Sequence, residues 1–126
     1  MMAVWRFMDY CSPAGNNLIQ EWYEDQVPQV QADFDTTLKT LAITLEWREL
    51  KQFKVLGKGL GEIRFKSGGV QFRPAGYFGP GARTFSIYVG CRKKQNVYDP
   101  PNAFELAAKR KAKVEAREGS LSERAV

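Results

Sequence analysis

Hydrophobic residues along the first half of the chain predict one strand followed by two helices. Residues 4–8 read Val-Trp-Arg-Phe-Met, which are residue types that suit a pleated, half-buried surface. A break at Ser12-Pro13-Ala14-Gly15 follows it. Asn16 or Asn17 is then expected to cap a helix that runs to about Gln26, since a short side-chain oxygen accepts hydrogen bonds from unpaired backbone N–H groups.

A second helix is indicated by apolar residues that recur every three or four positions after Pro28. Proline suits the first turn of a helix because its missing N–H would have no partner there. The apolar positions form one stripe, while polar residues occupy the other side. The pattern therefore predicts a helix that faces the core through Val30, Phe34, Leu38, Leu41, Ala42 and Leu45.

Glycine-containing turns divide the following segment into three strands. Gly57, Gly59 and Gly61 precede a strand, so we interpret them as a flexible connection between helix and strand and not as a nucleotide-binding loop. Gly68-Gly69 is a two-residue hairpin signal, and Gly79-Pro80-Gly81 marks a second turn. These turns predict an antiparallel meander of strands at residues 62–66, 70–73 and 84–91.

The C-terminal part predicts a basic helix and then a tail. Asp99 is the expected N-cap, with a proline at the first helical position. The helix carries Lys109, Arg110, Lys111, Lys113 and Arg117, and Gly119 is expected to end it. We expect a single domain at residues 1–118 and a flexible C-terminal tail at residues 119–126.

The composition excludes several kinds of catalytic and metal site but does not identify the function. The net charge of +5 favours polyanionic partners, although it does not establish one. The chain has no histidine, which excludes histidine as a nucleophile activator, general base or metal ligand. Its two cysteines have no zinc-binding spacing, and no stretch resembles a signal peptide or a membrane span. We therefore expect a cytoplasmic protein with no membrane association.

The meander places cations on one face of the sheet. Because side chains alternate along a strand, Arg64, Lys66, Arg73, Tyr88 and Arg92 are expected on the face that the helices leave open. A loop at Gly68-Gly69 sets Phe65 opposite Phe72 and Arg64 opposite Arg73. Opposed like charges destabilise a strand pair, so an anionic ligand would offset this arrangement. The alternative is two solvated arginines that splay apart.

The segment from Cys91 to Pro101, Cys-Arg-Lys-Lys-Gln-Asn-Val-Tyr-Asp-Pro-Pro, with Glu105, Ala107 and the pair Lys109-Arg110 after it, resembles a known family. It is similar to the phage-derived, HigB-like branch of the RelE/ParE toxin superfamily. The resemblance implies an α+β, RelE-like fold: a small antiparallel sheet in the order β-α-α-β-β-β-α, packed against helices on one face.

The resemblance also implies a function, namely the toxin of a type II toxin–antitoxin system. Such toxins are ribosome-dependent mRNA endoribonucleases that need no metal or cofactor and in which a ribose 2′-OH attacks the adjacent phosphate. The partners that the resemblance implies for this protein are mRNA, the ribosome and a cognate antitoxin encoded by an adjacent gene. By position, the resemblance assigns catalysis to Arg64, Arg73, Lys93, Lys94 and Tyr98. RNA contacts from Lys66, Tyr88 and Arg92 are expected because of their place on the open face of the sheet.

Two alternatives remain open at this point. The same fold is used by ParE-like inhibitors of DNA gyrase, which need no catalytic cations. It could also belong to a phage-derived accessory protein without catalytic activity. The chain departs from the family at Cys91-Arg92, where a hydrophobic residue usually stands, and in the glycine-rich loop at residues 78–83.

Overall fold

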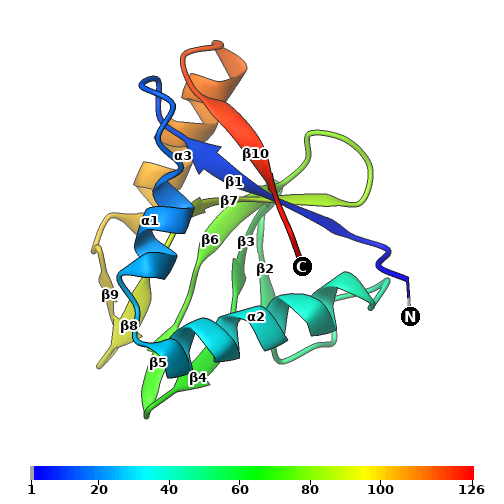
Figure 1. Ribbon diagram of the computed structural model, residues 1–126, viewed down its shortest axis with the longest axis vertical. Helices are drawn as coiled ribbons and strands as arrows, with labels where there is room; N and C mark the ends of the chain where they lie inside the picture. Colours follow the sequence, from blue (N-terminus) through cyan, green and yellow to red (C-terminus); the bar gives the residue numbers. More distant parts are fainter. Residues whose placement is uncertain (1) are drawn as a thin grey trace.

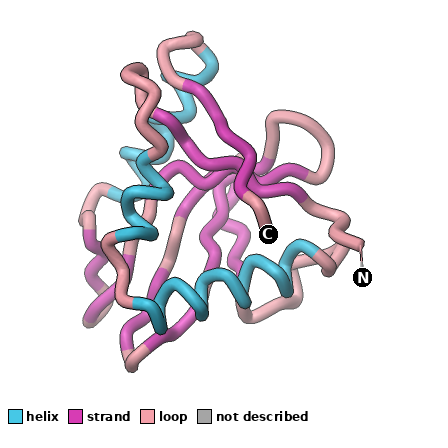
Figure 2. The backbone as a smooth tube through the Cα atoms, in the orientation of Figure 1, coloured by secondary structure: helices cyan, strands magenta, loops and turns pink. Residues whose placement is uncertain are grey.

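A computed structural model describes residues 2–126. The chain forms three helices and ten strands within that range (Figures 1 and 2). In chain order these elements are β1 (Arg6–Cys11), α1 (Leu18–Glu24), α2 (Pro28–Ala42), β2 (Phe53–Gly57), β3 (Leu60–Ile63), β4 (Phe65–Ser67), β5 (Val70–Phe72), β6 (Ala75–Phe78), β7 (Thr84–Val89), β8 (Arg92–Lys94), β9 (Val97–Asp99), α3 (Ala103–Glu115) and β10 (Ser120–Arg124).

The strands form two sheets, and at three places the chain passes directly from a strand of one sheet to a strand of the other. The six-stranded sheet has the order β10-β1-β7-β6-β3-β2, and the four-stranded sheet has the order β4-β5-β8-β9. Only Arg64 separates β3 from β4, and only Arg73-Pro74 separate β5 from β6. Gly90-Cys91 likewise separate β7 from β8. Each segment of the meander thus passes from one sheet into the other, and two of the three junctions contain an arginine.

The fold class expected from the resemblance is wrong. Strand β1 runs parallel to β7, and the chain returns at its end as β10, antiparallel to β1, so the large sheet is mixed and six-stranded. Together with the second sheet, this makes the described chain mostly sheet, and not the small antiparallel sheet of a RelE-like fold. Periodicity within a segment carries no information about these long-range pairings, which is why the sequence did not reveal them.

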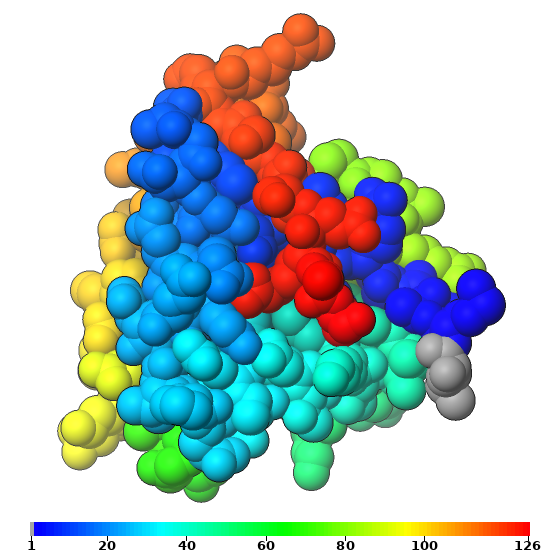
Figure 3. All heavy atoms as spheres, viewed as in Figure 1, coloured from blue at the N-terminus to red at the C-terminus, as the bar shows by residue number. Residues whose placement is uncertain are grey.

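Helices cover both faces of the large sheet. Helices α1 and α2 lie over the near face in Figure 1, with the C-terminal segment between them in the space-filling view (Figure 3). Helix α3 packs against β7 and β6, where Arg110 Nη1 donates to the Tyr88 carbonyl oxygen at 2.7 Å. All six residues of β7 are consequently buried. The expectation that helices cover one face only is therefore wrong.

The core is rich in aromatic residues and lies between the large sheet and helix α2. Phe34 and Leu38 point from α2 into this core, where they are fully or nearly fully buried. The Phe34 ring lies 5.7 Å from that of Phe65, which stacks on Phe72 with ring centroids 5.0 Å apart. This packing confirms that the stripe from Val30 to Ala42 faces the core, although the helix ends before Leu45.

Local predictions agree with the structure where neighbouring residues decide the conformation. Asn17 caps α1 by accepting from the backbone N–H groups of Ile19 and Gln20. The Gly68-Gly69 turn has positive φ at both positions, and Phe65 pairs with Phe72 in the predicted register. The first hairpin of the meander is confirmed.

Other local predictions are wrong. Gly57 ends β2 and Leu60 begins β3, so Lys58-Gly59 form a tight turn between paired strands, and Gly61 lies within β3, instead of a flexible connection between helix and strand. Asp99 ends β9, and Asn102 precedes the first residue of α3. Residues 120–124 were expected to be part of a flexible tail. They instead form strand β10, in which every residue pairs with a residue of β1.

Candidate functional site: a cationic cavity beside a buried glutamate

Glu62, in strand β3, is the centre of a polar cluster in an otherwise apolar layer. Its side chain is fully buried, and both carboxylate oxygens accept hydrogen bonds. Oε1 accepts from Nε and Nη2 of Arg64 at 3.0 and 2.9 Å, and Oε2 accepts from the Tyr98 hydroxyl at 2.8 Å. A buried carboxylate needs such partners because ionised oxygens are costly to remove from water. Glu62 thereby fixes the positions of Arg64 and Tyr98.

Arg73 lies on the same carboxylate but is less fully paired. Its Nε is 4.0 Å from Glu62 Oε1 and is buried without a hydrogen-bond partner among the described residues. Nη1 donates to the Phe72 carbonyl oxygen at 2.9 Å, and Nη2 donates to Gln71 Oε1 at 2.7 Å. Burial, followed by repulsion from Arg64, lowers the pKa of Arg73. Arg73 is thus a rigidly held cation whose charge is only partly compensated.

The two arginines open onto a cavity of about 430 Å³. Four cations line it, and none of the described residues in its wall is Asp or Glu. We call it the cationic cavity and define it by Thr37, Lys51, Gln52, Arg64, Phe65, Lys66, Gln71 and Arg73. Converging cations and neutral hydrogen-bonding groups form a site for a phosphate or another anion.

Tyr98 contributes to this site through its hydrogen bond to Glu62. It lies in β9 opposite Lys93 of β8, and the Lys93 ammonium is 5.4 Å from the centre of its ring. The Phe104 ring packs on Tyr98 with centroids 5.0 Å apart. Burial, together with the hydrogen bond to Glu62, raises the pKa of Tyr98 to about 12. The hydroxyl is therefore protonated at neutral pH and donates to Glu62, so it orients the site and does not accept a proton.

The remaining predicted residues are distributed unevenly. Lys66 lines the cationic cavity, while Lys94 is exposed on β8 beyond Lys93. Arg92 pairs with Asp99 across the β8–β9 hairpin at 3.3 Å. The structure thus brings Arg64, Lys66 and Arg73 into one wall, and places the β8 cations on the neighbouring hairpin.

Tyr88 does not belong to this site. Its side chain is 2% exposed, because helix α3 covers the sheet face on which the sequence analysis expected an open surface. Its ring packs against Tyr10 and Tyr77, and burial raises its pKa to about 12. The expected contact of Tyr88 with RNA is incompatible with this position.

Several residues of the site were not predicted, among them Glu62, Lys51 and Thr37. Glu62 lies two positions before Arg64 in the predicted strand at residues 62–66, a spacing that puts both side chains on one face and could have suggested the pair. Lys51 and Thr37 come from the segment before β2 and from α2. No local pattern indicates their approach to β4, because the approach depends on how α2 packs on the smaller sheet.

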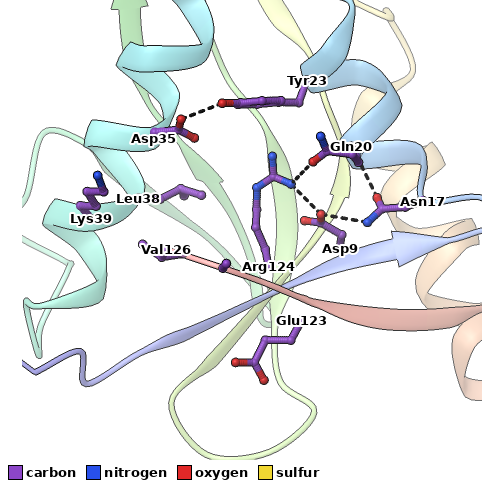
Figure 4. A pocket seen from close by; sticks show the side chains of 11 residues that line it. Asp9, Asn17, Gln20, Tyr23, Asp35, Leu38, Lys39, Glu123, Arg124 and Val126 are labelled. Atoms are coloured by element: carbon purple, nitrogen blue, oxygen red, sulfur yellow. Dashed lines mark hydrogen bonds and ion pairs between the residues drawn. The ribbon is translucent and has the colours of Figure 1, made fainter.

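A second buried carboxylate, Asp9 of β1, belongs to a different cavity (Figure 4). Its Oδ2 accepts from Arg124 Nη1 at 2.7 Å and from Asn17 Nδ2 at 3.1 Å. The same Arg124 nitrogen donates to Gln20 Oε1 at 3.0 Å, and the guanidinium stacks on the Tyr23 ring at 4.8 Å. These residues line a cavity of about 480 Å³, the Asp9 cavity. The Arg124 side chain is 8% exposed, whereas that of Arg64 at the cationic cavity is 31% exposed.

Comparison of the chain with protein-family models, curated proteins and solved structures finds no match. Among the described residues, no helix is both long enough and apolar enough to cross a membrane. In the same residues, no three His, Cys, Asp or Glu side chains are grouped so that they could hold a metal ion. What bears on function is therefore the geometry of the cationic cavity, together with the residues that resemble the toxin family.

Proposed function

We propose that this protein is an RNA-binding endoribonuclease that acts as the toxin of a type II toxin–antitoxin system, with the cationic cavity as its phosphate site. The observation that carries the proposal is the convergence of four cations, Lys51, Arg64, Lys66 and Arg73, on one cavity whose described wall residues include no carboxylate. A phosphate bound there would offset the repulsion between the two arginines. The resemblance of residues 91–110 to the toxin family supplies the reaction.

The reaction is the attack of a ribose 2′-oxygen on the adjacent phosphorus, which expels the 5′-oxygen of the next nucleotide. The 2′-hydroxyl loses its proton to a base, and the leaving 5′-oxygen gains a proton from an acid, so the products are a 2′,3′-cyclic phosphate and a 5′-hydroxyl. Arg64 and Arg73 would stabilise the negative charge that develops on the non-bridging oxygens. Lys93 and Lys94, on the hairpin next to Tyr98, are the candidates for proton transfer.

Glu62 has a positioning role in this proposal. It is fully buried, and its two oxygens are occupied by Arg64 and Tyr98, so it does not face the cavity. A negative charge behind the arginines fixes their geometry before RNA binds, which reduces the reorganisation needed in the transition state. An mRNA substrate on the ribosome and a cognate antitoxin encoded by an adjacent gene are parts of the proposal that the resemblance alone supports.

The test combines RNA binding, RNA cleavage and growth. We expect the wild-type protein to bind fluorescein-labelled oligouridylate at low salt, to cleave translated mRNA and to stop growth when its expression is induced. Arg73→Gln should weaken binding by about tenfold or more, as expected for a lost charged hydrogen bond, and should abolish cleavage. Lys109→Gln, which removes an exposed charge from α3, is the matched control and should retain both activities.

Unfolding of each variant in urea checks that the fold is intact, since Arg73 also donates to the Phe72 carbonyl oxygen. Absence of RNA binding at low salt, or intact mRNA in arrested cells, would contradict the proposal. Double-strand DNA breaks with intact mRNA would instead indicate inhibition of DNA gyrase.

A further inference from the structure

A separate groove lies at the opposite end of the β2–β3 hairpin from the cationic cavity. The cationic cavity includes Gln52 and Arg64 at the open end of the hairpin, whereas this groove includes the turn at residues 57–59. It has a volume of about 520 Å³. We call it the Trp5 groove and define it by Trp5, Leu45, Glu46, Trp47, Arg48, Val55, Gly57, Lys58, Gly59, Phe78 and Arg83.

The floor of the Trp5 groove is aromatic and has no free indole donor. The Trp5 ring packs on Trp47 with centroids 4.3 Å apart and on Phe78 at 5.6 Å. Trp5 Nε1 donates to the Leu45 carbonyl oxygen at 3.0 Å, and Trp47 Nε1 donates to two carbonyl oxygens at the end of α2. Because these donors are used internally, the floor offers apolar contact to a ligand.

The walls of the groove expose aliphatic side chains. Val55, in β2, is 40% exposed, and Leu45, after α2, is 50% exposed. Strand β2 is also the edge of the six-stranded sheet, with β3 as its only neighbour among the described strands. Exposed aliphatic side chains that gather around an aromatic floor next to a free sheet edge are typical of a protein-binding surface.

The rim of the groove is cationic, and two of its cations occupy unusual backbone positions. Arg48, Lys58 and Arg83 line it, against Glu46 as the one carboxylate among its described residues. Lys58 and Arg83 have φ of 54° and 51°, the left-handed region that favours glycine, and both occupy hairpin turns. Glycine would fit both turns without steric cost, so what distinguishes lysine and arginine there is their charge at the rim.

We propose that the Trp5 groove binds an acidic segment of a protein partner, with an apolar side chain against Trp5 and Val55 and carboxylates against Lys58 and Arg83. The charge of the rim is complementary to carboxylates, and the aliphatic walls match an apolar anchor residue. RNA fits less well, because Trp5 is packed against Trp47 and Phe78, and the exposed side chains are aliphatic groups on which bases do not stack.

The experiment measures fluorescence anisotropy of a labelled peptide in which Glu alternates with Leu and Phe. Two reference peptides replace either every Glu by Gln or every Leu and Phe by Ser, and labelled oligouridylate tests RNA. We expect the acidic, apolar peptide to bind the intact protein and both references to bind weakly. Lys58→Gly and Arg83→Gly should each weaken binding about threefold, and together about tenfold, because each removes one rim cation.

Both glycine substitutions suit the left-handed backbone, so thermal unfolding should show a folded protein. Val55→Glu should abolish peptide binding by placing a carboxylate in the groove, while Lys109→Gln on α3 should leave it unchanged. Equal binding of the acidic peptide and its Gln counterpart, or binding that survives both glycine substitutions and Val55→Glu, overturns the proposal. Binding of oligouridylate that these same variants weaken also overturns it, and assigns the groove to nucleic acid.

Discussion

Asp9 and Glu62 are both almost inaccessible to solvent and both accept hydrogen bonds from arginine, yet the arginines themselves differ in exposure. The Arg124 side chain on Asp9 is 8% exposed and is enclosed by Tyr23 and Phe34. The Arg64 side chain on Glu62 is 31% exposed, and its outer side lines the cationic cavity. The same pairing of a buried carboxylate with an arginine therefore serves two purposes in the two regions.

The enclosed pair joins distant parts of the chain. Arg124 lies in the last strand and contacts Asp9 of the first strand and Gln20 of α1. Such a pair resists separation because each charge would remain buried without the other. The open pair instead presents cations to a ligand, with the buried Glu62 holding them from behind. We therefore expect changes at the enclosed pair to affect mainly the stability of the protein, and changes at the open pair to affect RNA binding.

The largest expected effect is on the enclosed pair. Arg124→Met should lower the free energy of unfolding by about 3–5 kcal/mol, because it leaves the Asp9 carboxylate buried with Asn17 as its remaining partner. Unfolding in urea measures this change. Arg6→Met is the matched control: its contact with Glu123 spans the same two strands at 3.9 Å but is exposed, so its effect should stay within about 0.5 kcal/mol.

The pH dependence of Arg124→Met separates loss of charge pairing from loss of packing. Burial raises the pKa of Asp9 even with Arg124 present. A carboxyl whose pKa is raised on folding favours the folded state below its unfolded pKa, and this contribution is lost as the pH rises through the folded pKa. The defect of Arg124→Met should thus be larger at neutral pH than at about pH 4. A defect of equal size at both would attribute it to packing alone.

A smaller effect is expected where tyrosines support the two regions. Tyr98→Phe removes the hydroxyl that donates to the buried Glu62, and should lower the free energy of unfolding by about 2 kcal/mol. Tyr23→Phe removes a hydroxyl that donates to Asp35 at 2.7 Å, a partly exposed carboxylate, and should cost about 1 kcal/mol or less. Urea unfolding of both variants makes the comparison, and a larger loss for Tyr23→Phe would contradict it.

Tyr98→Phe should also weaken oligouridylate binding, since Glu62 would lose one of the groups that orient it behind Arg64. Tyr23→Phe should leave RNA affinity unchanged, because Tyr23 lies at the Asp9 cavity. The two variants thereby test whether the open region alone is connected to RNA binding.

The difference between the regions also explains which parts the sequence predicted. The pairing of Phe65 with Phe72, and hence the approach of Arg64 to Arg73, depends on a two-residue glycine turn that is readable in the sequence. The Asp9–Arg124 pair joins residues at opposite ends of the chain, and no periodicity relates them. The C-terminal strand therefore looks like a polar tail in the sequence, because its pairing with β1 is not encoded in any local pattern.

Burial of Tyr88 and Glu62 was missed for a related reason. Alternation along a strand assigns side chains to two faces, but it does not reveal whether both faces are covered. Helix α3 covers the face that holds Tyr88, and the junction at Arg64 turns Glu62 inward while leaving Arg64 at the cavity. Arg64, Lys66 and Arg73 were thus predictable from local pattern, whereas Lys51 and the carboxylate of Glu62 required the tertiary structure.

The smallest expected effect compares one lysine from each region. Lys66→Gln removes a cation from the cationic cavity, and Lys39→Gln makes the same chemical change at the Asp9 cavity. Both should change the free energy of unfolding by no more than about 0.5 kcal/mol. If Lys66 contacts a phosphate, its loss should reduce the slope of log affinity for oligouridylate against log salt by about 0.7, whereas Lys39→Gln should leave the slope unchanged. Equal slopes for the two variants would show that RNA senses only the overall charge of the protein and not the cavity that Arg64 and Arg73 define.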